Sequence, residues 1–145
     1  MRVLRKSISL ALAIPAAVTV VLGMAPQAQA DAGTGCPNWE YDCGEFYFNS
    51  HQTGSRVVFR GTNVPDLAGY HFLTAGAGKG QLVKNNAASF HNASVRDAAV
   101  FFNSGYTGPC DSFAKRTGTA RLKNTYNDNA SLRFGAAPSN CHRFS

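Results

Sequence analysis

A stretch of sequence in the first half of the chain is spelled again 54 residues later. Tyr47–Phe59 reads YFNSHQTGSRVVF, and Phe101–Phe113 reads FFNSGYTGPCDSF. Both copies open with an aromatic residue followed by Phe-Asn-Ser, continue to Thr-Gly and close on Phe. A repeat at a fixed internal spacing indicates a duplicated structural unit. This duplication constrains the fold more than any other feature of the sequence.

The repeat extends beyond these opening segments. Lys84–Phe90 reads KNNAASF and Asn127–Leu132 reads NDNASL, so each copy ends with polar residues, Ala-Ser and an apolar residue. Copies of this length hold about four short strands each, and a single such unit would leave one apolar face in water. We therefore predict two Greek keys that pack face to face and share one core.

Short apolar runs separated by Gly, Asn, Ser and Pro replace any helical periodicity. The runs are Phe46–Phe48, Val57–Phe59, Tyr70–Leu73, Ala99–Phe102 and Ser131–Phe134. This pattern predicts an antiparallel all-β domain. The segment from Gly61 to Gly80 carries Pro65 and five glycines, which predicts a long ordered connection with at most one short strand.

The N-terminus has the layout of a secretory signal peptide. Arg2, Arg5 and Lys6 precede an apolar run, and the run is followed by Ala28-Gln29-Ala30. A membrane anchor is the alternative, but Pro15 interrupts the run and alanines dilute it. We expect residues 1–30 to be a signal peptide and residues 31–145 to be one secreted domain that is not held in a membrane.

Charge argues against a nucleic-acid partner. After removal of the predicted signal peptide, eleven Lys and Arg exceed eight Asp and Glu by only three. These cations are dispersed, and the chain contains no basic stripe of the kind that follows a phosphate backbone.

Four cysteines in a chain with an export signal predict two disulfides. Three pairings are possible. The most local pairing joins Cys36 to Cys43 and Cys110 to Cys141. A zinc site is the alternative, but the spacings match no C-x2-C pattern.

No catalytic constellation is present in the sequence. It contains no G-x-S-x-G, H-E-x-x-H or P-loop motif. Three histidines recur every twenty residues: His51, His71 and His91. That spacing gives no reason for three imidazoles to converge in a β-rich chain. Glu40, Asp42 and Glu45 flank a tight ring and not a cleft, so we expect no enzymatic activity.

The opening segments resemble a known signature. Phe101–Gly108 fits the aromatic-x4-aromatic-x-Gly signature of βγ-crystallin Greek keys. Tyr47–Gly54 fits the same frame, with Gln52 in place of the second aromatic residue. The resemblance implies a folded hairpin in each copy, with a weaker aromatic corner in the first.

The chain from Cys36 to Phe134 also resembles the Streptomyces-type metalloproteinase inhibitor family, which consists of secreted peptidase inhibitors with a βγ-crystallin-like fold. The matching segments are Cys36-Pro37 followed by Cys43, Phe46–Phe48, Val64–Tyr70, Gly76–Gly80, Lys84–Ser89 and Asn124–Ser131. The resemblance implies an all-β fold of two Greek-key motifs packed as one βγ-crystallin-like sandwich domain. It also implies a secreted protease, expected to be a metalloproteinase, as the partner.

The resemblance to βγ-crystallins further implies calcium binding. Their sites use an (N/D)-(N/D)-x-x-(S/T)-S stretch from each Greek key, and two stretches here fit five of its six positions. By position, the ligands are Asn86, Ser89, Asp128 and Ser131. Only Asp128 is charged, so calcium should bind weakly and should not be a required cofactor. The alternative is that these Asn and Ser side chains only fix turns.

Two segments are candidates for contact with a protease. The first is the predicted Cys36–Cys43 ring with Trp39, Glu40 and Tyr41, since aromatic anchors are frequent at interface hot spots. The alternative is that Trp39 folds back over one end of the barrel. The second segment contains Gly108, Pro109 and Asp111; it lacks a cysteine partner within a few residues, unlike the family's short disulfide-closed contact loop.

The sequence thus predicts a secreted, monomeric inhibitor of metalloproteinases. Two other functions remain open: a βγ-crystallin-type calcium-binding or structural module, and a small antimicrobial or toxin domain, each without a protease target.

Overall fold

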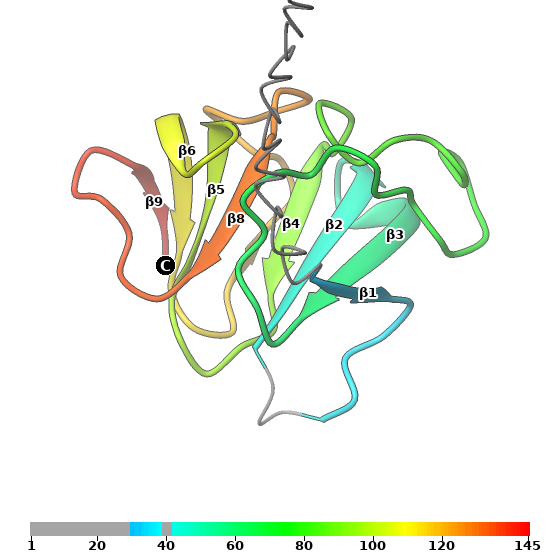
Figure 1. Cartoon of the computed structure of the whole chain (residues 1–145), viewed down its shortest axis with the longest axis horizontal. Coiled ribbons are helices and arrows are strands. Elements are labelled where there is room, and N and C mark those ends of the chain that lie inside the picture. Colours follow the sequence, from blue (N-terminus) through cyan, green and yellow to red (C-terminus); the bar gives the residue numbers. More distant parts are fainter. Residues whose placement is uncertain (1–29, 39–41) are drawn as a thin grey trace, which may run out of the picture.

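The computed structural model describes residues 30–38 and 42–145, and this part of the chain is built from β-strands (Figure 1). Residues 1–29, which make up most of the predicted signal peptide, lie outside the described residues. The strands are β1 Asp31–Gly33, β2 Cys43–Asn49, β3 Thr53–Arg60, β4 Ser89–Asn92, β5 Ala98–Asn103, β6 Thr107–Phe113, β7 Gly118–Thr119, β8 Ser131–Phe134 and β9 His142–Phe144. Within the described residues, no helix is long and apolar enough to cross a membrane.

The strands form two sheets that repeat the same pattern, which confirms the predicted pair of Greek keys. One sheet has the order β1-β3-β2-β4-β7 and the other has the order β8-β5-β6-β9. The triplet β3-β2-β4 in the first sheet corresponds to β6-β5-β8 in the second, with antiparallel pairing throughout both triplets. Figure 1 shows β2, β3 and β4 in one sheet and β5, β6 and β8 in the other.

Each half of the chain also supplies a segment to the other half's sheet. Val64 lies in the connection between β3 and β4, yet it bridges Leu132 of β8 with hydrogen bonds of 2.8 and 2.9 Å. In the reciprocal position, β7 lies between β6 and β8 in sequence and pairs with β4, where Thr119 faces Phe90. The third segment of each Greek key is therefore exchanged between the sheets.

The two repeated hairpins fold in the same way. Gln52 and Tyr106 occupy equivalent positions with φ of 54° and 63°, and the glycines two residues later have φ of 76° and 81°. A serine from the end of each copy holds its hairpin. Ser89 donates to the Asn49 carbonyl at 2.6 Å and accepts the Gln52 N–H at 3.0 Å.

Ser131 makes the matching contacts in the second copy, with the Asn103 carbonyl at 2.7 Å and the Tyr106 N–H at 3.1 Å. Phe101 and Tyr106 form the predicted aromatic corner, with ring centroids 6.0 Å apart. The first copy lacks this ring pair but keeps the same turn geometry, because its serine supports the backbone directly.

The core lies between the sheets and is rich in phenylalanine. Phe90 of β4 and Phe113 of β6 meet across it with ring centroids 4.8 Å apart, and both side chains are fully buried. Phe46 packs against Phe90 at the same distance. The sheets approach so closely at Gly44 that an added Cβ would lie 2.8 Å from the Leu132 side chain. The repeat exists because each half completes the core of the other.

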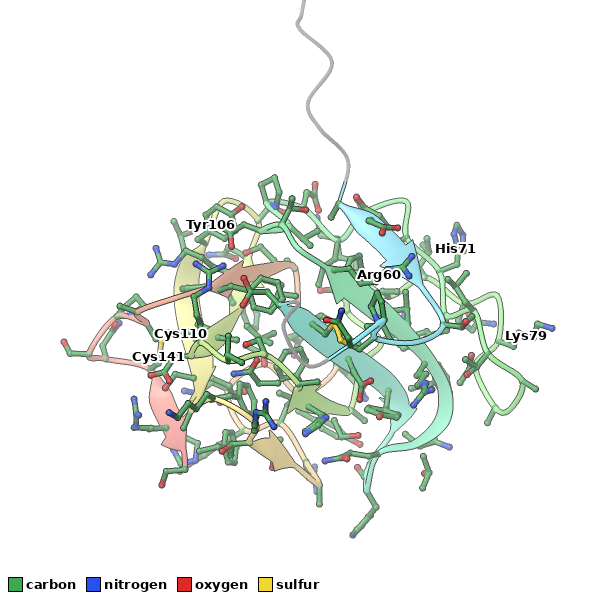
Figure 2. The ribbon with its side chains drawn as sticks, turned by 90° about the horizontal axis from the view of Figure 1, so that it is seen from below. Arg60, His71, Lys79, Tyr106, Cys110 and Cys141 are labelled. Atoms are coloured by element: carbon green, nitrogen blue, oxygen red, sulfur yellow. A yellow bond between two sulfur atoms is a disulfide. The ribbon has the colours of Figure 1, made fainter. Side chains whose placement is uncertain are left out.

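The long connection between β3 and β4 has a defined structure, as predicted, but none of the nine strands lies in it. Tyr70–Leu73, predicted as a strand, instead forms only an isolated bridge between His71 and Leu82. Phe72 is buried in the core between the exposed His71 and Leu73, and the next two backbone N–H groups, of Leu73 and Thr74, bond to the Arg56 carbonyl instead of continuing the pairing. Figure 2 shows that His71 and Lys79 lie at the end of the molecule opposite the Cys110–Cys141 disulfide.

Both disulfides have the predicted local pairing. Cys36 is joined to Cys43 and Cys110 to Cys141, with Cα–Cα distances of 5.9 and 4.7 Å. Their sequence separations of 7 and 31 residues correspond, by the loop-closure relation, to roughly 2.5 and 3.7 kcal/mol of stabilisation.

The hairpin glycines give a direct test of this fold. Gly54→Ala should lower the free energy of unfolding by roughly 2 kcal/mol and Gly108→Ala by about 1 kcal/mol or more, because a positive φ strains alanine by about 1 kcal/mol. At Gly54 the new Cβ would also lie 3.0 Å from the Ala77 carbonyl oxygen of the backbone, whereas at Gly108 it would lie 2.7 Å from the end of the exposed Asn103 side chain, which can shift. Urea unfolding measures the change.

Two other glycines separate backbone strain from crowding. Gly61 has φ +74° and open space around it, so Gly61→Ala should show the strain alone, about 1 kcal/mol. Gly35 has open space and no positive φ, so Gly35→Ala should change little. A Gly54→Ala variant as stable as Gly35→Ala would contradict the hairpin geometry.

Candidate functional site

The disulfide ring that contains the first candidate loop is fixed to the first sheet at both ends. At its C-terminal end, Cys43 is fully buried and the Asp42 carbonyl accepts the Gly61 N–H at 2.8 Å. The Asp42 carboxylate is paired with Arg96, whose Nε lies 3.1 Å from Oδ1 and whose Nη2 contacts the other oxygen. This hydrogen bonding raises the pKa of Arg96 above its ordinary value.

The N-terminal end of the ring continues from strand β1. This strand pairs with β3, where Asp31 and Arg60 also form an ion pair at 2.8 Å. Next to it, Arg56 donates to the Thr34 carbonyl at 3.2 Å. The proposed contact residues Trp39, Glu40 and Tyr41 lie outside the described residues, so their presentation stays a prediction.

A polar cluster that the sequence analysis did not find lies near this ring. Glu45 on β2 and His91 on β4 are register partners, and His91 Nδ1 lies 3.1 Å from the Glu45 carboxylate. The Tyr47 hydroxyl donates to the same oxygen at 2.8 Å. Burial raises the pKa of the Glu45 carboxyl, but the hydrogen bonds from His91 and Tyr47 outweigh it and leave that pKa below its ordinary value.

The cluster stands beside a shallow pocket of about 390 Å³, which is lined by Cys36, Asn38, His91, Ala93 and Arg116. Glu45 and Asp42, two acidic residues that flank the ring in sequence, are thus both engaged in structural pairs. Of the three evenly spaced histidines, only His91 has a carboxylate within hydrogen-bonding distance of its ring among the contacts of the described chain. No group of three or more His, Cys, Asp or Glu that could hold a metal occurs among the described residues.

The second candidate segment lies in strand β6 and is only partly accessible. Gly108 and Pro109 are exposed near the start of the strand, where these two residues lie opposite the single residue Phe102 in a bulge. Cys110 and Asp111 are buried, and Asp111 has no exposed surface. The first three residues of β6 are exposed and the last four are buried, so a partner could touch Gly108 and Pro109 directly but not Asp111.

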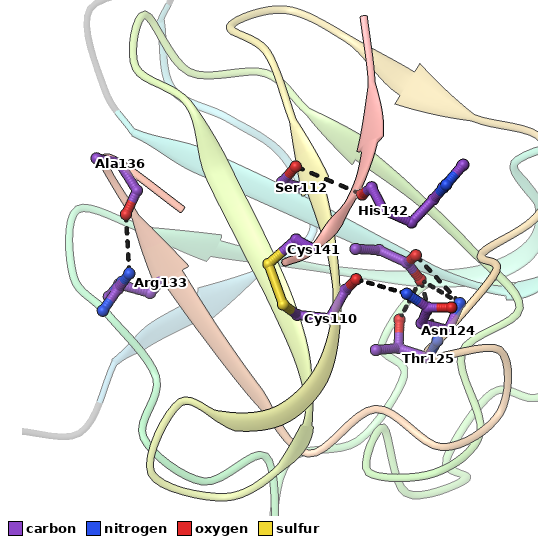
Figure 3. The surroundings of a disulfide bond; sticks show 9 residues. Cys110, Ser112, Asn124, Thr125, Arg133, Ala136, Cys141 and His142 are labelled. Atoms are coloured by element: carbon purple, nitrogen blue, oxygen red, sulfur yellow. Dashed lines mark hydrogen bonds between the residues drawn. A yellow bond between two sulfur atoms is a disulfide. The ribbon is translucent and has the colours of Figure 1, made fainter. Parts of the chain in front are cut away.

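Asp111 instead clasps the segment that follows β7. Its carboxylate accepts the backbone N–H groups of Lys123, Asn124 and Thr125 at 3.0 to 3.1 Å, and the Thr125 hydroxyl donates at 2.8 Å. The Asn124 side chain also donates to the Cys110 carbonyl at 2.9 Å. Figure 3 shows Asn124 and Thr125 gathered beside the Cys110–Cys141 disulfide. A lone Asp in a sequence gives no signal of such backbone donors, so this clasp was missed.

Two of the four predicted calcium ligands, Asn86 and Asp128, line two equivalent pockets. Asn86 lines one, of about 310 Å³, together with Asn49 and Asn127. Asp128 lines the other, of about 280 Å³, together with Asn85 and Asn103. The two pockets are related by the internal repeat, since Asn49 and Asn103 are equivalent residues.

Ser89 and Ser131 are fully buried, and their hydroxyls make the hairpin contacts described above. The residues before them, Ala88 and Ala130, line the two pockets and offer no side-chain oxygen. Lys84 lines the pocket of Asp128 and donates to Ser104 at 3.0 Å. A cation there would meet one carboxylate and one ammonium, a donor set suited to weak calcium binding at most.

Comparison with known proteins supports the fold and nothing finer. No family model and no curated protein matches the sequence. The structure is similar to a solved structure described as "Evolution of the eye lens beta-gamma-crystallin domain fold", with a TM-score of 0.57 and 12% sequence identity. The match covers 76% of this chain and 100% of that chain. The described domain therefore has the βγ-crystallin fold that the repeated signature predicts.

Asp111→Ala should lower the free energy of unfolding by roughly 3 kcal/mol, because it leaves buried backbone N–H groups without an acceptor. Chemical denaturation followed by circular dichroism measures this loss. Asp128→Ala, at an exposed carboxylate, is the matched control and should cost about 0.5 kcal/mol or less. Equal losses at both positions would show that the clasp does not stabilise the domain.

Calcium at millimolar concentration should raise the melting temperature by a few degrees at most, because the stabilisation RT ln(1 + [L]/Kd) stays small for a weak site. Asp128→Ala should abolish this increment, whereas Asp66→Ala, at a carboxylate bound to Lys84 outside the predicted motif, should not. Differential scanning calorimetry in calcium and in EDTA provides the measurement. The absence of any calcium effect in the unmodified protein would leave the Asn-Ser stretches with a turn-forming role alone.

Proposed function

We propose that this βγ-crystallin-like domain is a secreted proteinase inhibitor that targets a metalloproteinase through the ring closed by Cys36 and Cys43. The observation that carries the proposal is the anchoring of this ring. The disulfide closes it, Asp42 holds one end through Arg96 and Gly61, and β1 holds the other end against β3.

Such anchoring favours inhibition for a physical reason. A loop that enters an active site loses conformational freedom, and the entropy cost is smaller when the free protein already restrains the ends of the loop. The ring also contains the only Trp of the chain, next to a Glu and close to a Tyr. Large aromatic side chains supply much of the binding energy at interface hot spots.

Secretion is consistent with the two disulfides of the domain. Two disulfides, with no free cysteine among the described residues, are typical of proteins that fold in an oxidising environment. The signal peptide predicted from the N-terminal sequence is consistent with export. Secretion would place the ring where extracellular proteases act.

The proposal predicts that Trp39→Ala weakens binding of a metalloproteinase of the thermolysin type by about 2 kcal/mol, or roughly thirtyfold, without unfolding the domain. Inhibition constants from a titration of the purified protein give the measurement, and a subtilisin-type protease tests the target class. The matched variant is Pro109→Ala, at the exposed start of β6, which should leave the inhibition constant unchanged.

Each other outcome has a definite meaning. Loss of binding in Pro109→Ala alone would move the contact surface to the second hairpin. Unfolding of Trp39→Ala would assign Trp39 to the core. If the unmodified protein inhibits no protease of either type at micromolar concentration, the inhibitor proposal fails.

A structural or calcium-binding module is the second candidate, and two observations favour it: the similarity to a βγ-crystallin domain and the pair of equivalent Asn-lined pockets. An antimicrobial or toxin domain is the third. A calcium-dependent rise in melting temperature without protease binding supports the module, and growth inhibition of neighbouring bacteria without protease binding supports the toxin.

A further inference from the structure

A large cavity among the described residues lies beside the segment that Asp111 clasps. It is a groove of about 570 Å³ between the segment 121–126 and strand β9, open to solvent, and it is lined by Arg121, Leu122, Lys123, Tyr126, His142 and Phe144. The proposed inhibition uses none of these six residues, and only Tyr126 also lines one of the two calcium pockets. The groove therefore requires an explanation of its own.

The groove carries positive charge that no described carboxylate neutralises. Arg121 and Lys123 are exposed, and neither takes part in an ion pair within the described chain. The Arg121 guanidinium lies over the Tyr126 ring at 4.2 Å, an arrangement that leaves the in-plane N–H donors of arginine available. The acidic residue behind the segment is Asp111, and it is fully buried by its backbone donors.

Aromatic surface accompanies the charge. Phe144 is only half-buried; it stacks on Phe113 with centroids 5.0 Å apart and planes 11° apart. His142 packs edge-on against Phe144 at 4.7 Å. The groove thus presents rings on the β9 side and cations on the other side, which fits a ligand that combines carboxylates with apolar or aromatic groups.

Both walls of the groove are held in place before any ligand arrives. Asp111 clasps residues 123–125 through their backbone N–H groups, which leaves the Lys123 side chain directed to solvent. On the other wall, His142 follows Cys141 of the disulfide and is the register partner of Asp111 in the parallel pair of β6 and β9. Figure 3 shows the disulfide, Asn124 and His142 around this clasp.

Strand β9 has an edge that could form backbone hydrogen bonds with a ligand. It is the last strand in the order β8-β5-β6-β9, so one of its edges carries no partner strand among the described residues. An exposed strand edge accepts an extended peptide through backbone hydrogen bonds, while side-chain pockets select the peptide sequence.

We propose that this groove binds an extended acidic segment of a partner protein, which adds alongside β9 and places its carboxylates against Arg121 and Lys123. A small anion would remain largely exposed in so open a groove, whereas a peptide continues beyond it and gains backbone contacts. Complementary charge supplies specificity and a faster association rate, both of which decline with added salt.

The probe is the acetylated and amidated hexapeptide EYDEYD, titrated into the purified isotope-labelled protein and followed by amide NMR. Shifts should concentrate in residues 121–126 and 142–144, with half-saturation at roughly 1 mM or below. The peptide QYNQYN, in which an amide replaces each carboxylate, should bind at least tenfold more weakly. Arg121→Gln with Lys123→Gln should weaken EYDEYD binding at least tenfold.

The matched control is Lys79→Gln with Lys115→Gln, which removes the same net charge from two exposed lysines outside the groove and should weaken binding less than threefold. If the groove variant fails to fold, Lys123→Gln alone keeps the Asp111 clasp, since only its backbone is used there, and should weaken binding severalfold.

Several results would overturn the proposal. They are equal weakening in the groove and control variants, equal binding of QYNQYN, shifts confined to other surfaces, or no binding of EYDEYD. Tighter binding of an oligothymidylate to the same residues would identify a site for polyanions and not for acidic peptides. None of these outcomes bears on protease inhibition, which the ring variants test separately.

Discussion

The exchange of one segment between the two Greek keys is the constraint on which the rest of the structure depends. Leu132 of the second half bonds to Val64 of the first, and Phe90 of the first half faces Thr119 of the second. Neither half can complete its own sheet, so the two must form together. Backbone hydrogen bonds align the two sheets, and the phenylalanines buried between them stabilise this arrangement further through the hydrophobic effect.

The two equivalent serines, Ser89 and Ser131, stabilise the hairpins and do not line the two predicted calcium pockets. Each hydroxyl both donates and accepts within its hairpin, so it stabilises the turn without any ligand. The neighbouring positions that line the pockets are alanines in both copies. The serine of each copy therefore holds its hairpin closed, and the side-chain amides of the neighbouring Asn residues are the neutral oxygen donors that line the two pockets.

The sequence was informative where local chemistry repeats and uninformative where distant residues meet. The two Greek keys, the folded hairpins and the disulfide pairing could be predicted, because the aromatic-Gly signature and the cysteine spacing are local. The clasp of Asp111, the partnership of Glu45 with His91 and the parallel pairing of β9 could not. Each of these joins residues that no pattern in the chain relates, and each forms only when the sheets are in place.

The placement of the disulfides affects both oxidative folding and unfolding of the protein. Each bridge joins cysteines of the same half, and Cys36 and Cys43 both emerge during synthesis long before Cys110. Oxidation in order of emergence therefore gives the native pairs without thiol–disulfide reshuffling. Because neither bridge crosses from one sheet to the other, the polypeptide chain is the one covalent link between the halves in the described residues. Separation of the two sheets therefore requires no disulfide to break.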